Sequence, residues 1–309
     1  MKAGTLAMPL ASLGHGTKCI ANAFDHIGVF CGHEVIGMST AGSVQDLPMH
    51  LYRQLFNYDR IYSVKRKQSR TSDGRLANFY HRRWKHARAG YKQMDDGVRN
   101  EGLWLLRKAS ERFVEAAPYN VFVEVSGLAS EYWPLLKEIY DTRFIHILID
   151  GRKWVQKLMW YKCFTDERPT TYGVQHKPVT AYEFPSMWFP SKTYSHDDDQ
   201  LNRFHKCCDL WNGLHSWFSE ATDVSVRVED FNKPETGQLV LDTLYPEATA
   251  KQVAGFTLQD DMYNKGQGNA AMYEEEPYGI PHWSEWGDKY NEIFDSVCGD
   301  AMKRFGYDN

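Results

Sequence analysis

Short apolar runs alternate along the chain with longer segments in which apolar residues recur at helical spacing. Five runs have the length of a strand, at residues 5–12, 29–31, 119–125, 143–149 and 224–228. Helical spacing is found at residues 19–28, 97–117, 130–140, 153–162, 200–219 and 286–305. Ser130 is expected to cap the third of these helices. Because this rhythm is typical of βαβ units, we predict an α/β fold, with a central parallel sheet in a three-layer α/β/α arrangement.

Two long stretches interrupt the rhythm. Residues 38–97 are polar and irregular, and residues 163–199 contain four prolines with little periodicity. Residues 251–281 are also rich in loop-forming residues. Because the chain has no internal repeat and no low-complexity linker, we predict a single domain over residues 1–309, with excursions at about 38–97 and 163–199.

Residues 60–92 form a strongly basic segment, with eleven Lys or Arg against one acid, Asp73. Interleaved aromatic residues argue against simple disorder. The segment is interpreted either as a solvated helical excursion or as an electropositive wall facing an anionic cofactor or substrate. Because the whole chain carries a net charge of −4, nucleic acid is not the expected partner.

Composition narrows the class of protein further. No apolar run approaches the roughly 18 residues that a membrane span requires, and the N-terminus lacks a secretory signal, so we expect no membrane association. The six cysteines show no C-x-x-C or disulfide-framework spacing, which predicts a reduced, cytoplasmic protein. The three acids at residues 197–199 precede a predicted helix, so the helix dipole explains them better than a metal site does.

The turn after the first apolar run is the first candidate site. Residues 13–18, Leu-Gly-His-Gly-Thr-Lys, separate a buried strand from the start of a helix. Backbone N–H groups at a helix start bind anions, Gly14 and Gly16 allow close approach, and Lys18 adds positive charge. The turn therefore predicts a site for a phosphate or sulfate group, with an ordinary strand-to-helix turn as the alternative. It is not a Walker A sequence, because Gly-Lys-Ser/Thr is missing.

A carboxylate follows the second apolar run. Ligands of parallel sheets bind beyond the carboxyl ends of the strands, so Glu34 is expected at the same rim as the turn, where a general base is useful. His33 is its nearest competitor. Glu124, expected at the end of the next strand, is the third candidate, with a rim carboxylate paired to the basic segment as the alternative interpretation.

The order of these motifs resembles the sulfotransferases that use 3′-phosphoadenosine 5′-phosphosulfate (PAPS). The loop at Gly14–Lys18 takes the place of the family's 5′-phosphosulfate loop, and residues 144–157 take the place of its 3′-phosphate strand and turn. Residues 226–231, Val-Arg-Val-Glu-Asp-Phe, and the C-terminal motifs at Lys265-Gly266, residues 282–286 and residues 302–307 also fit.

The resemblance implies a P-loop NTPase-like sulfotransferase fold, a small-molecule hydroxyl or N–H as acceptor, and 3′,5′-adenosine bisphosphate (PAP) as product, without a metal. It implies Glu34, His33 and Lys18 as catalytic residues. It implies as cofactor-binding residues Gly14, His15, Gly16, Thr17, Lys18, Cys19, Arg152, Lys157, Lys265 and Gly266.

The chain departs from the family pattern at both phosphate positions. Gly14 stands where the loop Lys or Arg is usual, Ile149 replaces the Arg that grips the 3′-phosphate, and Lys157 falls at the Ser position. We infer that positive charge has been relocated, to Lys18 at the sulfuryl end and to Lys157 with Arg152 and Lys265 at the 3′ end. The rival inference is a weakened donor site.

Two other function classes stay open at this point. A P-loop-type small-molecule kinase is disfavoured by the missing Gly-Lys-Ser/Thr and the lack of an obvious magnesium carboxylate. A catalytically silent sulfotransferase-like binding protein is motivated by the substitutions at Gly14 and Ile149.

Overall fold

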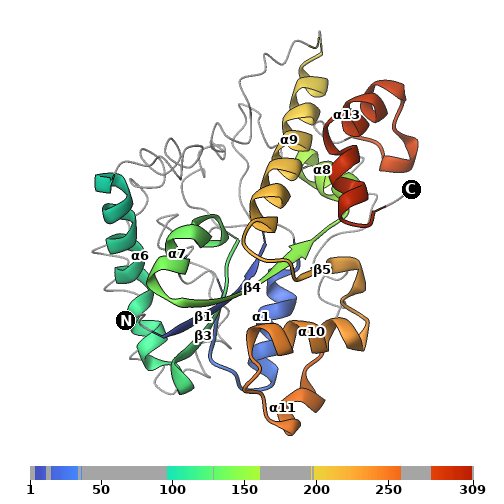
Figure 1. Cartoon of the computed structure of the whole chain (residues 1–309). Helices are drawn as coiled ribbons and strands as arrows, with labels where there is room; N and C mark the ends of the chain where they lie inside the picture. The colour runs from blue at the N-terminus through green and yellow to red at the C-terminus, as the bar shows by residue number, and fades with distance from the viewer. Residues whose placement is uncertain are drawn as a thin grey trace, which may run out of the picture. The chain divides into compact units, whose positions relative to one another are not determined.

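The computed structural model describes residues 4–11, 15–33, 36, 96–127, 129–160, 196, 198–258 and 280–307 (Figure 1). The chain divides into two compact units. The first unit is formed by residues 1–147 and 218–263, and the second by residues 148–217 and 264–309.

The first unit is built on a five-stranded sheet with the strand order β2-β3-β1-β4-β5. The strands are β1 (Thr5–Leu10), β2 (Cys31–His33), β3 (Val121–Val125), β4 (Asp141–Leu148) and β5 (Ser225–Arg227). The pairings of β2 with β3, β3 with β1 and β1 with β4 are parallel. The predicted α/β fold with a central parallel sheet and flanking helices is confirmed.

The central strands explain why the apolar runs were visible in the sequence. Every residue of β3 is buried, and so is all of β1 except Thr5. Strands covered on both faces need apolar side chains on both faces, so they appear as continuous apolar runs and not as an alternation. β2 begins two residues later than its predicted start, at Cys31, because its pairing with Val123–Val125 determines its position.

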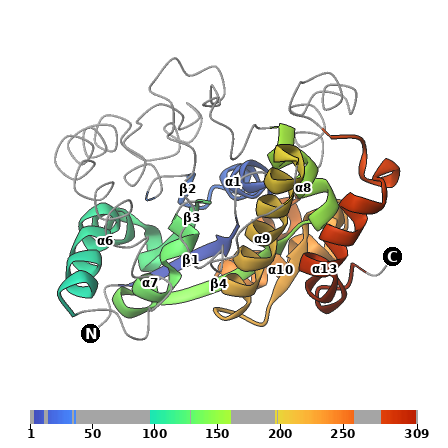
Figure 2. The same ribbon diagram turned by 90° about the horizontal axis from the view of Figure 1, so that it is seen from above.

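Several helices and short 3₁₀ turns accompany the sheet in the first unit. The helices are α1 (Thr17–His26), α6 (Asp96–Ala116), α7 (Trp133–Ile139), α10 (Pro234–Leu244) and α11 (Ala250–Gly255). The 3₁₀ turns are η3 (Pro118–Asn120), η4 (Ala129–Tyr132) and η6 (Val228–Asp230). α6 packs on β3 through Phe113, whose ring stacks on Phe122 with centroids 5.5 Å apart. Figure 2 shows α6 and α7 side by side, joined by an ion pair between Arg99 and Glu138.

The interpretation of residues 251–281 as loop is corrected at its start. α11 forms there because Thr249 and Gln252 build a capping box, in which the Thr249 side chain accepts from the Gln252 N–H and the Gln252 side chain accepts from the Thr249 N–H. The rest of that stretch up to residue 279 lies outside the described residues. The two predicted excursions also fall mostly outside them.

The prediction that Ser130 caps a helix is wrong. Ser130 lies inside η4 and is fully buried, and α7 begins three residues later without a side-chain cap among the described residues. The Ser130 hydroxyl donates to the carbonyl of Ser126, 2.6 Å away, and accepts from the N–H of Ala11 at 3.2 Å. Ser130 therefore ties the end of β1 to the end of β3, because a buried hydroxyl satisfies the nearest backbone groups.

The second unit consists of helices around an aromatic core. It contains α8 (Gly151–Trp160), most of α9 (Asp199–Ser219), the 3₁₀ turn η8 (Trp283–Glu285) and α13 (Asp288–Arg304). Phe204 and Trp211 of α9 are fully buried, and the Phe204 ring meets Trp286 edge-on at 4.9 Å. None of the helices in the described part of the chain is long and apolar enough to cross a bilayer.

Gly151 and Gly299 give a matched test of the packing in this unit. A methyl group on Gly151 would lie 3.1 Å from atoms of Met302, Phe294 and Trp211, whereas one on Gly299 would meet nothing within 4 Å among the described residues. We expect Gly151→Ala to destabilise the protein by about 1–3 kcal/mol through overpacking. Gly299→Ala, inside α13, should stabilise it by about 0.5–1 kcal/mol.

Urea unfolding of both variants beside the wild type measures the two effects. A Gly151→Ala variant as stable as the wild type, or a destabilised Gly299→Ala variant, would contradict the packing described.

Candidate functional site

The turn after β1 leaves the sheet at its topological switch point. α1 follows β1 and leads toward β2 on one side, whereas β4, the other neighbour of β1, leads on to β5 on the opposite side. Leu10 at the end of β1 lies opposite His146 of β4. Ligands of open parallel sheets bind beyond the carboxyl ends of the strands at such a point. The topology therefore places the predicted anion turn where the fold favours a ligand.

Gly16 shapes the turn. Its φ of 68° is left-handed, and its carbonyl accepts the N–H groups of Cys19 and Ile20 at 2.9 and 3.2 Å. No side chain of the described residues caps α1 at Gly16, and its first turn holds no acid. Within the described residues, the first turn of α1 therefore has no carboxylate of its own to compensate the positive end of the helix dipole, which favours binding an anion.

Phe231 covers the same turn. A Cβ atom on Gly16 would lie 2.9 Å from Cε2 of Phe231, so the ring contacts the glycine backbone directly. Phe231 is buried and follows η6, in the segment 226–231 that resembles the family motif. The turn at Gly16 and the segment 226–231 are far apart in the sequence, and both belong to the motifs that resemble the sulfotransferases. They are in contact within the first unit.

A small charged cluster holds the turn that presents Phe231. Asp230 accepts from Lys233 at 2.8 Å and from Nε of Arg227 at 3.1 Å, and the Phe231 N–H donates to the carbonyl of Val228. The hydrogen bond from Lys233, with the nearby Arg227 charge, holds the pKa of the Asp230 carboxyl below its usual value. These partly exposed pairs contribute about 0–1 kcal/mol each, so their effect is mainly to orient the turn.

Glu124 is the last residue but one of β3, and its side chain is buried. Its side chain is 0 % exposed, and Gly32 of β2 lies opposite it. One carboxylate oxygen accepts the N–H of Ile36 at 2.9 Å. The alternative interpretation of Glu124 as an exposed rim carboxylate is therefore corrected, because its side chain is buried. The basic segment lies outside the described residues. Burial, and after it the charges of Glu124 and Asp25, raise the pKa of the Cys31 thiol well above its usual value.

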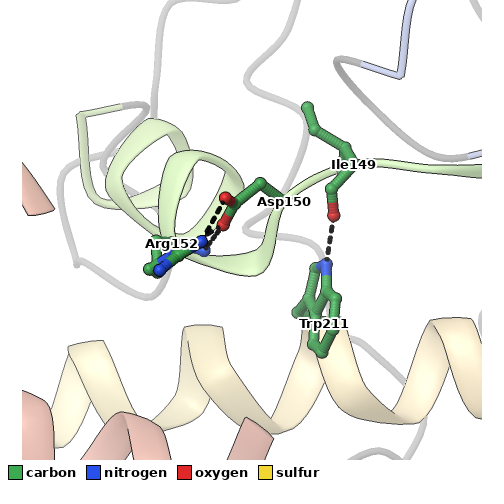
Figure 3. Close-up of polar contacts among 4 residues, drawn as sticks. All are labelled: Ile149, Asp150, Arg152 and Trp211. Carbon is green, nitrogen blue, oxygen red and sulfur yellow. Dashed lines mark hydrogen bonds and ion pairs between the residues drawn. The ribbon is translucent and has the colours of Figure 1, made fainter. Parts of the chain in front are cut away.

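The predicted 3′-phosphate turn lies in the second unit (Figure 3). The guanidinium of Arg152 donates to both carboxylate oxygens of Asp150, at 3.0 and 2.8 Å, and the Arg152 N–H donates to the same side chain. The Cζ atom of the Arg152 guanidinium lies 4.4 Å from the ring centroid of Trp283. The indole of Trp211 donates to the carbonyl of Ile149 at 3.1 Å. Arg152 is therefore held in a fixed position at the start of α8.

Lys157 lies in the same helix and is buried, with 4 % of its surface exposed. Burial lowers the pKa of Lys157 to about 8. Burial favours the neutral amine at this position, and an anion bound nearby would favour the charged form.

The predicted site residues that the structure describes fall into three groups. His15, Gly16, Thr17, Lys18 and Cys19 come together at the turn and the first residues of α1, with His15 and Cys19 buried. His33 ends β2. Arg152 and Lys157 lie in α8 of the second unit. Outside the described residues lie Gly14, Glu34, Lys265 and Gly266. The catalytic and binding roles of all these residues stay predictions.

Three contacts near the predicted site residues could not be predicted from the sequence. They are the cover that Phe231 places on Gly16, the Ser130 bridge between strand ends, and the Asp150–Trp283 clamp on Arg152. Each depends on a contact between distant residues. In the described part of the chain, no group of three or more His, Cys, Asp or Glu side chains is arranged to hold a metal ion.

Comparison with known proteins gives one solved structure to report. No protein-family model matches the chain, and no curated protein matches it. Among solved structures, the chain is similar to the sulfotransferase domain from the Synechococcus PCC 7002 olefin synthase. The identity is 11%, the TM-score is 0.45, and the alignment covers 100% of this chain and 96% of that chain.

Proposed function

We propose that the protein is a sulfotransferase that moves a sulfuryl group from PAPS to a hydroxyl or N–H of a small-molecule acceptor. The observation that supports it best is the contact between Gly16 and Phe231. It joins an anion-type turn at the switch point to the second segment of the resemblance. A resemblance based only on motif order does not require these segments to touch.

The proposed reaction is an in-line transfer through a loose transition state. The acceptor oxygen or nitrogen forms a bond to sulfur while the bond from sulfur to the 5′-phosphate oxygen breaks, and a base takes the acceptor proton. PAP leaves with the electron pair of the broken bond. Catalysis of this kind depends on positioning and on stabilising charge at the departing phosphate.

The roles follow from the sequence resemblance. Lys18 and the N–H groups at the start of α1 would stabilise the departing 5′-phosphate, with Gly14 to Cys19 forming the loop. Glu34 would take the acceptor proton, with His33 as its competitor. The 3′-phosphate would be bound by Arg152, Lys157, Lys265 and the adjoining Gly266. We also propose a cytoplasmic location, following the cysteine pattern.

Nucleotide binding tests the proposal first. Ligand at a hundred times its Kd adds about 2.7 kcal/mol of stability, so saturating PAP should raise the melting temperature by several degrees. ATP with magnesium, tested in parallel, should raise it less. A clear shift with ATP and magnesium and none with PAP would favour a kinase instead.

Product formation tests the reaction. Incubation with PAPS and a panel of small phenols, alcohols and amines should yield a sulfated product, detected by mass spectrometry together with PAP. A shift with PAP but no sulfated product from any acceptor would identify a catalytically silent binding protein.

A further inference from the structure

The helices α9 and α13 pack along each other in the second unit (Figure 1). Near the start of both helices, the rings of Phe204 and Tyr290 meet edge-on at a centroid distance of 4.8 Å. Near their ends, Arg304 donates to the hydroxyl of Ser216 at 3.2 Å. The later residue of α9 thus meets the later residue of α13, so the two helices run in the same direction and are attached to each other at both ends.

Two cysteine side chains meet between these attachments. The Cys298 thiol of α13 donates to the backbone carbonyl of Cys208 in α9 at 3.5 Å, and the two side chains are also hydrogen-bonded to each other. Both are fully buried, and both are free thiols. One turn further along α9, the side chain of Asn212 donates to the carbonyl of Val297 at 2.9 Å. The packing of the two helices therefore keeps the thiols of Cys208 and Cys298 together.

Cys207 shows that position, and not residue type, distinguishes this pair. It precedes Cys208 in α9 and is equally buried, but its thiol donates to Sδ of Met159 in α8 at 3.9 Å. Successive residues of an α-helix point about 100° apart, so Cys207 faces α8 while Cys208 faces α13. A thioether cannot form a disulfide, whereas a second thiol can.

We propose that Cys208 and Cys298 are an oxidation site, at which hydrogen peroxide converts the two thiols into a disulfide between α9 and α13. One sulfur attacks the peroxide, the O–O bond breaks, and a sulfenic acid forms with release of water. The second sulfur then forms the S–S bond and displaces the sulfenic oxygen as a second water. The two thiols lose two electrons and two protons, and the peroxide takes them up.

Burial determines how the site responds to an oxidant. Burial, and after it the hydrogen bond and the charge of Cys298, raise the pKa of the Cys208 thiol well above its usual value. Because the thiolate is the reacting form, the pair stays reduced at low peroxide and reacts when peroxide is abundant or the two helices separate transiently. A peroxide molecule needs a smaller opening than a bulky disulfide oxidant does, which is why the proposal names peroxide.

Peptide mapping of the full chain under non-reducing conditions tests the inference. The protein is treated with hydrogen peroxide, the remaining thiols are blocked with N-ethylmaleimide in denaturant, and linked peptides are identified by mass spectrometry. We expect a peptide pair linked through Cys208 and Cys298 as the main disulfide product, and dithiothreitol should remove it. If this pair stays absent at peroxide concentrations that oxidise other residues of the chain, the inference is overturned.

Variants and thermal unfolding give a second readout. Cys208→Ala and Cys298→Ala should each abolish the linked peptides, whereas Cys207→Ala, a matched truncation in the same helix, should keep them. The bond would join residues 90 positions apart and restrict the unfolded chain. Peroxide-treated wild type should therefore melt at least about 5 °C higher before dithiothreitol than after it.

The thermal result has its own contradicting outcomes. No difference on adding dithiothreitol to the wild type, or an equal difference in Cys298→Ala, would overturn the inference. Neither readout uses PAPS or an acceptor. A protein that forms the disulfide and yields no sulfated product would count against the proposed function alone.

Discussion

Replacing Gly16 with alanine is expected to destabilise the protein more than the same replacement at Gly28, and to abolish most of its PAP binding. Both glycines have a left-handed backbone, with φ of 68° and 72°, and they lie at the two ends of α1. An alanine in this conformation costs about 1–2 kcal/mol at either position. Among the residues that the structure describes, the new methyl group meets another side chain at Gly16 and not at Gly28.

The additional cost at Gly16 comes from Phe231. The methyl carbon would lie 2.9 Å from Cε2 and 3.6 Å from Cδ2 of that ring, whereas at Gly28 nothing lies within 4 Å among the described residues. The ring is buried and its turn is held by Asp230, so it has little freedom to withdraw. Overpacking of this kind costs about 1–3 kcal/mol beyond the backbone strain.

Urea unfolding of Gly16→Ala, Gly28→Ala, Phe231→Leu and Gly16→Ala combined with Phe231→Leu measures these contributions. The smaller side chain should recover part of the loss at Gly16, which a double-mutant cycle reports as a coupling energy. Gly28→Ala should keep the thermal shift with PAP, and Gly16→Ala should reduce PAP affinity at least tenfold. Equal destabilisation and equal PAP binding in the two variants would remove the support that the Gly16–Phe231 contact gives to the proposed site.

The strands were predictable because burial on both faces leaves a continuous apolar run. The runs at residues 119–125 and 143–149 correspond to β3 and β4 within two residues. Gly16 was also predictable, because a glycine between a strand and a helix indicates an unusual backbone or a close approach. The contact between Gly16 and Phe231 was not predictable, because it depends on how the whole sheet places β5 and η6.

Two of the mistaken interpretations, those of Ser130 and Glu124, have a common physical cause. Ser130 has the residue type of a helix cap, and Glu124 has the residue type of a rim carboxylate, but both side chains are fully buried. A buried polar group bonds to the backbone groups nearest to it in space. For Ser130 these are Ser126 and Ala11, and for Glu124 the N–H of Ile36. Local sequence patterns do not contain that information.

Replacing Lys157 with methionine is expected to stabilise the unliganded protein while weakening PAP binding. Burial lowers the pKa of Lys157 from 10.5 to about 8, so the charged amine is disfavoured in the folded state. A shift of this size corresponds to about 3 kcal/mol at 1.36 kcal/mol per pKa unit. An apolar side chain of similar length avoids that cost at pH 7, so the unfolding free energy of Lys157→Met should rise by about 1–3 kcal/mol.

The sign of the pH dependence follows from the same shift. Between pH 8 and 10.5 the unfolded chain binds the Lys157 proton and the folded chain does not, so this residue makes the wild type more stable as pH rises through that window. Lys157→Met lacks this contribution. The advantage of the variant over the wild type should therefore be nearly constant below pH 8 and shrink as pH rises from 8 toward 10.5. Taking the difference between the two proteins cancels the other titrating groups, including Tyr140, whose pKa burial raises to about 12.

A 3′-phosphate bound at Lys157 reverses the balance, because the anion compensates the buried charge. Binding of PAP should then raise the pKa of Lys157 and take up a proton near pH 8, so that affinity falls as pH rises through that value. Isothermal calorimetry in two buffers of different ionisation enthalpy measures the proton uptake. Lys157→Met should lose at least tenfold in affinity at pH 7 and all of this uptake, while Lys153→Met, at an exposed position of the same helix, should keep both. If Lys157→Met gains stability and still binds PAP with wild-type affinity, the assignment of Lys157 to the 3′-phosphate is wrong.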